Sequence, residues 1–417
     1  ASQFRLSMVL VVGQIALSVV VITAAGLILH SLYSLLQVNP GFRTDRIVTA
    51  EVSMDATACP NHPIAPTAGA PGTPATGRCE VFFETLLDRV RGIPGTENAA
   101  LTDSLPLSGR DSNYVYDAEN HPREARQGAL LATGRTVSPG YFATLGMPLI
   151  RGRLIENQDA SGASHAVIIN ERMAQRLWPH QDPLGRHIIN VNDEPTPAVW
   201  NPNAASTVVG VVGNTHEGSL AGGFGDEVYL PMTGVNEQPV MYVMLRTQMN
   251  AAQAAEGLRR AVAEVDPLVP VTRVRTLNEV VSASVSAPRS LAILLLGFGG
   301  LAVVIGAVGV YSLIAYIVSW RTREIGVRLA LGARRWQIVR AIVKQSLLLA
   351  AAGSALGLAA AAASARLLHS FLFQVSPLDP VTFCAVPLMM GVLALAAAWI
   401  PARRAASVDP MEALRSE

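Results

Sequence analysis

The stretch REIGVRLALGARR, residues 323–335, carries four arginines and one glutamate and lies between two long apolar segments. Read as an α-helix, it is about 12 residues, or roughly 18 Å, long. Ile325 and Leu329 share one face because they are one helical turn apart, whereas the arginines lie elsewhere. Gly332 can adopt a positive φ and end this helix. The pattern fits two interpretations: a short helix that receives a push from a soluble partner, or a basic anchor that lies on lipid headgroups.

The neighbouring apolar segments belong to a set of four that contain no Asp, Glu, Lys or Arg: residues 6–39, 290–320, 345–365 and 380–402. As helices, the first two would be about 46–50 Å long and the last two about 31–35 Å, against about 30 Å of bilayer hydrocarbon. The sequence therefore predicts four transmembrane helices. Because the first two segments flank the longest polar part of the chain, we expect both to extend beyond the membrane as a stalk.

The distribution of cations predicts the orientation in the membrane. Seven cations lie between Arg321 and Lys344 and three follow the fourth apolar segment, whereas the connection at residues 367–379 has none. The positive-inside rule then places residues 323–335 and both termini in the cytoplasm, and residues 40–288 in the periplasm. We therefore expect a multi-pass protein of the bacterial inner membrane.

Residues 40–288 show the periodicities of a soluble domain that contains both strands and helices. Strand–helix–strand patterns at both ends and a strand-rich middle predict a periplasmic α/β domain with an inserted β-rich subdomain. The predicted strands are residues 47–54, 99–101, 207–212, 227–230 and 241–246, and the predicted helices are residues 80–92, 170–177 and 251–265. The expected domains are a first transmembrane helix (1–39), this periplasmic domain (40–288) and a membrane domain with three further helices (289–417).

Two cysteines, Cys59 and Cys79, flank a segment rich in Pro, Gly, Thr and Ala (residues 56–78) that is typical of a long loop. In an oxidising periplasm we expect these cysteines to form a disulfide. A metal site formed by Cys59, His62 and Cys79 is the alternative, but it lacks a fourth ligand. Cys384 lies in the fourth apolar segment, and we expect it to be buried as a small apolar side chain.

No motif in the sequence indicates an enzyme. A P-loop needs a lysine after a glycine-rich turn, and the single lysine, Lys344, has no glycines ahead of it. ATP hydrolysis by a P-loop of this chain is therefore excluded. His180, Asp182 and His187 are close in sequence, but the Pro and Gly residues among them favour solvated loop positions over a catalytic or metal site. A net charge of +1 gives no reason to expect nucleic-acid binding.

Three features of the apolar segments bear on function. Gly353 and Gly357 have the spacing that permits close helix packing. His30 lies near the outer end of the first segment, where its ring can reach the interface. The absence of charged residues from all four segments weighs against a proton-coupled carrier.

Several stretches resemble known permease families. REIGVRLALGARR is similar to the cytoplasmic coupling segment of FtsX-like permeases of ABC transporters, and PARRAASVDPMEALRSE (401–417) to their C-terminal signature. Three stretches resemble the periplasmic core domain of MacB-type permeases: SPGYFATLGMPLIRGR (138–153), VIINERMAQRLWPHQDPLGR (167–186) and VVGVVGN (208–214). LHSFLFQVSPLDPVTF (368–383) is typical of one repeat of the duplicated, acidobacterial-type predicted permeases. The last resemblance implies that the chain is half of a longer protein.

These resemblances imply a non-catalytic permease subunit that transmits ATP-driven motion of a cytoplasmic ATPase to the periplasmic domain. The exported molecule would be a macrolide, peptide, lipoprotein or lipid. ATP and magnesium would bind the partner ATPase, with no cofactor on this chain; a second permease unit, a periplasmic adaptor and membrane lipid are the other expected partners. The residues expected to contact the ATPase are Arg323, Glu324, Gly326, Arg328, Leu331, Gly332 and Ala333. The alternative is a membrane scaffold or sensor whose periplasmic domain binds and activates a partner.

Overall fold

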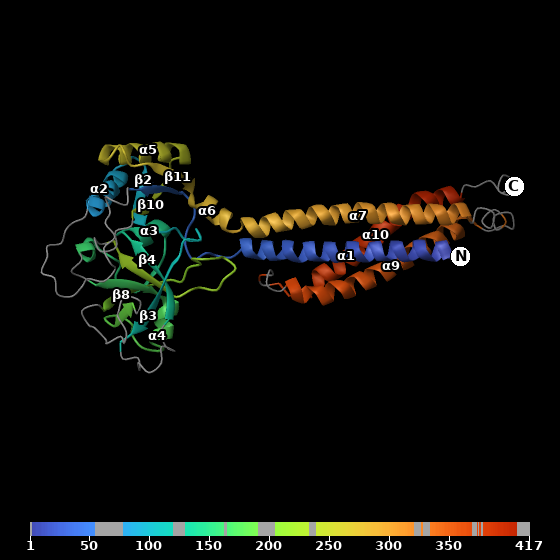
Figure 1. Ribbon diagram of the computed structural model, residues 1–417, viewed down its shortest axis with the longest axis horizontal. Helices are drawn as coiled ribbons and strands as arrows, with labels where there is room; N and C mark the ends of the chain where they lie inside the picture. Colours follow the sequence, from blue (N-terminus) through green and yellow to red (C-terminus); the bar gives the residue numbers. More distant parts are fainter. Residues whose placement is uncertain are drawn as a thin grey trace. The chain divides into compact units, whose positions relative to one another are not determined.

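The computed structural model describes residues 2–54, 78–119, 130–161, 165–190, 205–232, 239–320, 327, 334–368, 373, 375–376 and 378–406. The chain forms two compact units. Residues 1–38 and 286–417 make up the first unit, which contains the long apolar helices, and residues 39–285 make up the second, which contains the described strands (Figure 1).

The described part of the first unit consists of four long helices that lie side by side (Figure 1). They are α1 (Ser2–Leu36), α7 (Ser286–Trp320), α9 (Arg335–Leu368) and α10 (Pro380–Ala406). Each is long and apolar enough to cross a membrane, so the prediction of four membrane helices is confirmed. α1 and α7 each contain 35 residues. At about 52 Å, both are longer than the roughly 30 Å hydrocarbon layer.

The third membrane helix begins earlier than its apolar segment. α9 starts at Arg335 and carries Arg340 and Lys344 before the charge-free residues begin at Gln345. Arginine and lysine are strong helix formers. In addition, Arg334 N–H donates to the Gln337 side chain at 3.2 Å ahead of the first turn. Helix propensity and capping thus extend the helix beyond the apolar run.

A shared apolar core holds the four helices together. Val11, Ile15 and Val19 of α1 are buried in it. Their neighbours are Val310, Leu313, Ile314 and Ile317 of α7, Ile338, Ile342 and Leu349 of α9, and Val386, Met390, Ala394 and Ala398 of α10. All four helices contact one another, and the contacts of α1 with α7 and α9 are the most extensive.

The second unit begins with a four-stranded antiparallel sheet. Its order is β11 (Val271–Thr276), β1 (Ile47–Ser53), β10 (Val240–Thr247) and β2 (Thr96–Thr102). Alternate residues of β1, Val48, Ala50 and Val52, share a core with two helices, α2 (Arg78–Arg91) and α5 (Ala251–Val265). The period of two in the strand and the amphipathic pattern of the helices explain this layer of helix on sheet.

The inserted β-rich subdomain is a closed ring of six strands. Around the ring they are β4 (Leu130–Val137), β3 (Ser112–Ala118), β7 (His187–Asn190), β8 (Ser206–Val212), β6 (Ala166–Asn170) and β9 (Glu227–Pro231), and β9 pairs again with β4. Closure leaves no strand edge of the ring unpaired. Helix α4 (Glu171–Leu177) buries Met173 and Leu177 in the core of this subdomain.

A narrow junction links the sheet to the ring. Only one residue pair, Thr102 and Val137, joins β2 to β4 in the described residues. The remaining short elements are β5 (Leu149–Gly152), which pairs with β8, the helices α3 (Tyr141–Leu145) and α6 (Leu277–Ser284), and a 3₁₀ helix (Asn157–Ser161). The prediction of an α/β domain with an inserted β-rich subdomain is confirmed.

Candidate functional site

The residues predicted to contact an ATPase lie outside the described part of the chain: Arg323, Glu324, Gly326, Arg328, Leu331, Gly332 and Ala333. Between residues 321 and 333 only Val327 is described, and it is helical and exposed. Trp320 at the end of α7 and Trp336 at the start of α9 are both exposed. Exposed tryptophans at helix ends are typical of a membrane–water interface.

The glycines predicted to pack helices lie where α9 approaches α1. A Cβ atom on Gly353 would be 2.6 Å from Ile15 Cγ2, and one on Gly357 would be 2.6 Å from the backbone oxygen of Ala16. Both distances are too short for any side chain. Glycine therefore permits this close contact between the two helices.

A similar close contact joins α1 to α7. Ser18 Oγ donates to the backbone oxygen of Ala302 at 3.0 Å, which bonds α1 directly to α7. A Cβ on Gly309 would lie 2.5 Å from Gln14 Oε1. Since α1 is packed closely on both sides, a displacement of α7 relative to α9 must also move or strain α1.

His30 is exposed near the C-terminal end of α1, which agrees with its expected position, and it also contacts the residue that precedes α10. Its Nδ1 is 3.4 Å from Asp379 Oδ2, and Asp379 also accepts hydrogen bonds from the Thr382 backbone N–H (2.9 Å) and hydroxyl (2.7 Å). Asp379 thus caps the N-terminus of α10. The backbone N–H of Phe373 donates to Ser31 Oγ at 2.8 Å, which ties the connection between α9 and α10 to α1.

The cysteines have different environments. Cys79, in the first turn of α2, is disulfide-bonded and buried in the core, while Cys59 and His62 lie outside the described residues. No group of His, Cys, Asp and Glu in the described residues could hold a metal ion. Cys384 is exposed, so the prediction that it is buried is wrong. It precedes the buried Val386 by two residues, which turns it to the opposite side of α10.

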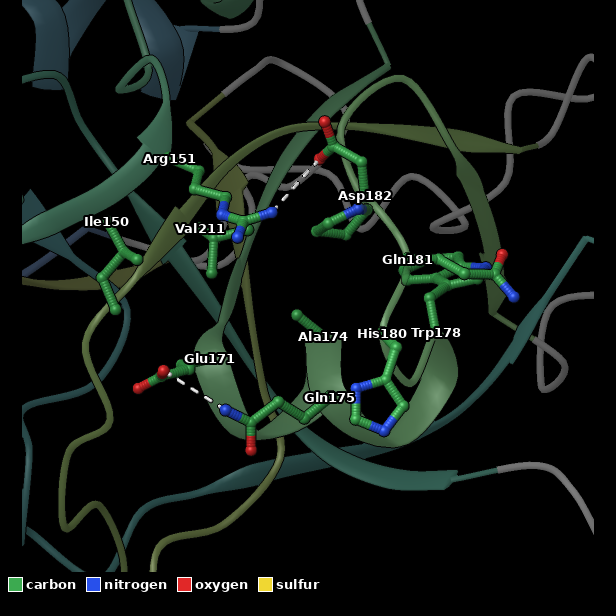
Figure 2. A pocket seen from close by; sticks show the side chains of 11 residues that line it. Ile150, Arg151, Glu171, Ala174, Gln175, Trp178, His180, Gln181, Asp182 and Val211 are labelled. Carbon is green, nitrogen blue, oxygen red and sulfur yellow. Dashed lines mark hydrogen bonds and ion pairs between the residues drawn. The ribbon is translucent and has the colours of Figure 1, made fainter.

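A cleft of about 460 Å³ lies on the second unit, between α4, β5 and the loop that follows α4 (Figure 2). Its lining is mostly polar. Arg151 Nη1 lies 4.0 Å from Asp182 Oδ1 on one side, and Gln175 donates to Glu171 at 3.2 Å on the other. His180 has a φ of +62°, a conformation rarely adopted by residues other than glycine. The cleft thus combines an ion pair, amide groups and a strained histidine.

Three residues that are close in sequence, His180, Asp182 and His187, differ in their position relative to this cleft. His180 and Asp182 line it from a turn, which agrees with the expected loop positions. His187 instead begins β7, and its Nδ1 is 2.7 Å from Glu119 Oε2, so its prediction as a solvated loop residue is wrong. The apolar residues Ile188 and Ile189 that follow it were the available signal for a strand.

Comparison with known proteins gives matches across nearly the whole chain. Residues 8–261, more than half of the chain, match the MacB-like periplasmic core domain family, and residues 296–410 match the FtsX-like permease C-terminal family. The solved periplasmic region of MacB from Actinobacillus actinomycetemcomitans aligns with a TM-score of 0.37 and 11% identity, over 60% of this chain and 97% of that one.

Curated relatives are named macrolide export ATP-binding/permease protein MacB. The relative from Azoarcus sp. (strain BH72) is 25% identical over 83% of this chain and 50% of its own length. The relative from Escherichia coli (strain K12) is 25% identical over 69% of this chain and 44% of its own length. The chain thus spans about half the length of the curated relatives it matches. On the family matches, the chain belongs to the ABC transporter permeases that combine a MacB-like periplasmic core domain with an FtsX-like permease domain.

Proposed function

We propose that the chain is a non-catalytic permease subunit that transmits ATP-driven motion of a cytoplasmic ATPase to its periplasmic domain. The connection between helices and sheet carries this proposal. α1 leads through residues 37–46 into β1, and β11 and α6 precede α7. β1 and β11 are antiparallel neighbours, with Val48 opposite Thr276 and Val52 opposite Val271. Tension on either helix therefore acts on the same pair of hydrogen-bonded strands.

The packing of the membrane helices supplies a route for this motion. The coupling segment, residues 321–334, is covalently continuous with α7 and α9. Both helices pack closely on α1, through Gly309 and Gly353 respectively. Because close-packed interfaces resist continuous deformation, a push on the segment would shift the helices together. The charge-free spans offer no carboxylate or amine for a proton relay, which favours an ATP-driven mechanism.

The partners follow from the same proposal. ATP and magnesium would bind a separate ATPase subunit or domain, since Lys344 is not part of a P-loop. A second permease unit, as a homodimer or tandem repeat, and a periplasmic adaptor would complete the assembly. The relatives named for macrolide export support a macrolide as the cargo. Peptide, lipoprotein and lipid are the other cargo classes that the resemblance to FtsX-like permeases implies. The cation distribution supports insertion in the bacterial inner membrane with residues 323–335 in the cytoplasm.

The test uses the full chain reconstituted in lipid with its ATPase. Charge reversal at Arg328 (Arg328→Glu) and a helix break at Gly332 (Gly332→Pro) should each lower stimulated ATP hydrolysis by at least about tenfold, the equivalent of roughly 1.4 kcal/mol of lost coupling. Arg340→Glu is the matched control, because Arg340 is an exposed arginine farther along α9. Unchanged stimulation in both test variants would refute the assignment.

The cleft of Figure 2 supports a second candidate function, a scaffold or sensor whose periplasmic domain binds and activates a partner. A scaffold would capture its partner without ATP, whereas a permease would change its affinity for a periplasmic protein through the ATPase cycle. Pull-down with the full chain and its Arg151→Ala variant, with and without ATP, separates the two. Capture that is independent of ATP and lost in the variant would favour the scaffold.

A further inference from the structure

A cluster of buried polar side chains lies at the junction between the sheet and the ring. Arg135 on β4 is 1% exposed, Glu217 in the loop after β8 is 5% exposed, and Glu227 on β9 is 2% exposed. Thr215 lies between the two glutamates and is fully buried. A buried charge without a partner costs free energy, so each of these side chains must be either paired or neutral.

The contacts of Thr215 favour a proton on one of the glutamates. Its Oγ1 is 3.0 Å from Glu217 Oε1 and 2.8 Å from Glu227 Oε2. A hydroxyl has one hydrogen to donate, and an ionised carboxylate can only accept. Tyr229 cannot supply the missing hydrogen, because its hydroxyl donates to Glu227 Oε2 at 2.6 Å. The Tyr229 hydroxyl oxygen is also 3.4 Å from Thr215 Oγ1. A proton on one of the two carboxyl groups satisfies both short contacts to Thr215 without two anions competing for one hydrogen.

The charges around the cluster place this proton on Glu227. Burial raises the pKa of Glu217 as well, but Arg135 pairs directly with it and opposes that shift, so Glu217 is the better stabilised anion of the two. Asp111 lies 3.8 Å from the same guanidinium, and Asp103, whose pKa is raised by burial, also interacts electrostatically with it, so several carboxyl groups share Arg135 as their cation. Glu227 has no ion pair, and its Oε1 is buried without a hydrogen-bond partner in the described residues. A neutral carboxyl group tolerates that environment far better than an anion.

Electrostatics agree with this assignment. Burial raises the pKa of Glu227 well above its usual value, and the nearby Glu217 raises it further, whereas its hydrogen-bond contacts with Tyr229 and Thr215 and the charge of Arg135 oppose the shift. Burial also raises the pKa of Tyr229, next to the two glutamates, so it stays protonated as a donor.

The loop that carries Thr215 and Glu217 is attached to the first residues of the domain. His216 N–H donates to the Pro40 backbone oxygen at 2.9 Å, and Leu107 N–H donates to the Glu217 backbone oxygen at 2.6 Å. The first bond connects the loop to the segment that follows α1 in the chain, and the second connects it to the segment between β2 and β3.

We propose that Glu227 is a proton-binding site: at neutral pH it holds a proton that bridges through Thr215 to Glu217, and loss of this proton loosens the loop at residues 213–217. The proton bridge needs no ATPase and is therefore independent of the proposed transport function. Deprotonation would leave two buried carboxylates on either side of the Thr215 hydroxyl, with Arg135 paired to Glu217.

The sign of the pH effect follows from linkage. The unfolded chain loses this proton near pH 4.3, while the folded chain keeps it to a higher pH. Between the pKa of the unfolded chain and that of the folded chain, unfolding therefore releases a proton. The contribution of Glu227 to the free energy of unfolding is complete at low pH and declines as the pH rises through this range. The unfolding equilibrium should shift about tenfold per pH unit for one proton in this window.

Infrared spectroscopy of the full chain in detergent tests the site. The wild type should show the carbonyl stretch of a protonated carboxyl group at about pH 7, and Glu227→Gln should remove part of that band. Glu264→Gln, at an exposed glutamate of α5, should leave the band unchanged. Thermal unfolding measured from about pH 5.5 to about pH 8 should depend less on pH in Glu227→Gln than in the control. An identical band in wild type and Glu227→Gln, or no band in the wild type, would overturn the proposal.

Discussion

Alanines at Gly353 and Gly357 should force α9 away from α1. In each case a new Cβ would lie 2.6 Å from atoms of α1, and ordinary contact begins at 3.4 Å, so the helices must separate by about 0.8 Å (3.4 − 2.6). Overpacking costs about 1–3 kcal/mol per site, or about 4 kcal/mol for the pair. Alanine has a better helix propensity than glycine, and the two substitutions together offset about 2 kcal/mol of this overpacking cost. The expected net loss is therefore about 2 kcal/mol, or about 4–8 °C in unfolding midpoint.

The assay is thermal unfolding of the full chain in detergent, followed by circular dichroism. Alanines at Gly297 and Gly300 provide a matched control on α7, because a Cβ at either position meets nothing within 4 Å. The control pair keeps the propensity gain without the clash, so its midpoint should rise. If both pairs of substitutions moved the midpoint in the same direction by a similar amount, the close α1–α9 contact would not be the reason for the glycines.

Three further perturbations test other parts of the structure. Cys79→Ser should destabilise the periplasmic domain by about 2–5 kcal/mol, and a reducing agent should lower the stability of the wild type but not of the variant. Arg153→Ala removes the partner of Asp159, which lies 2.5 Å away and is 1% exposed, and should cost up to about 3 kcal/mol in urea unfolding. Asp379→Ala removes the cap of α10 and should cost about 1 kcal/mol, seen as faster hydrogen exchange at Thr382.

The membrane helices could be predicted from sequence because a charge-free run of about 20 residues has few other stable environments. Their ends were less predictable. α9 begins at Arg335, since arginine and lysine continue a helix as readily as apolar residues do. The orientation of single residues also needed the structure: Cys384 and Val386 are two positions apart, yet only Val386 is buried.

In the periplasmic domain some strands with a continuous apolar run were predicted, but the short apolar strand β6 was missed, as were strands with polar faces. β8 contains TVVGVV and was predicted, whereas β11, VTRVRT, has arginines at alternate positions and was not. The closed ring could not be derived, because its closing pair joins β4 and β9, nearly a hundred residues apart. Arg135 and Glu217 are separated by 82 residues, and each alone resembles a solvated surface charge.

The buried cluster also explains how the ring can close in one register. β4 and β9 are parallel, with Arg135 opposite Tyr229 and Thr133 opposite Glu227. Because strand side chains alternate between faces, a slip by one residue would turn Arg135 away from Glu217 and leave buried charges unpaired. Removing one partner of a buried ion pair costs about 3–5 kcal/mol, and this cost adds to that of turning the apolar side chains of the strand out of the core. We therefore expect the cluster to contribute specificity of strand pairing more than net stability, and Glu227 is tolerated within it because it is neutral when the ring is closed.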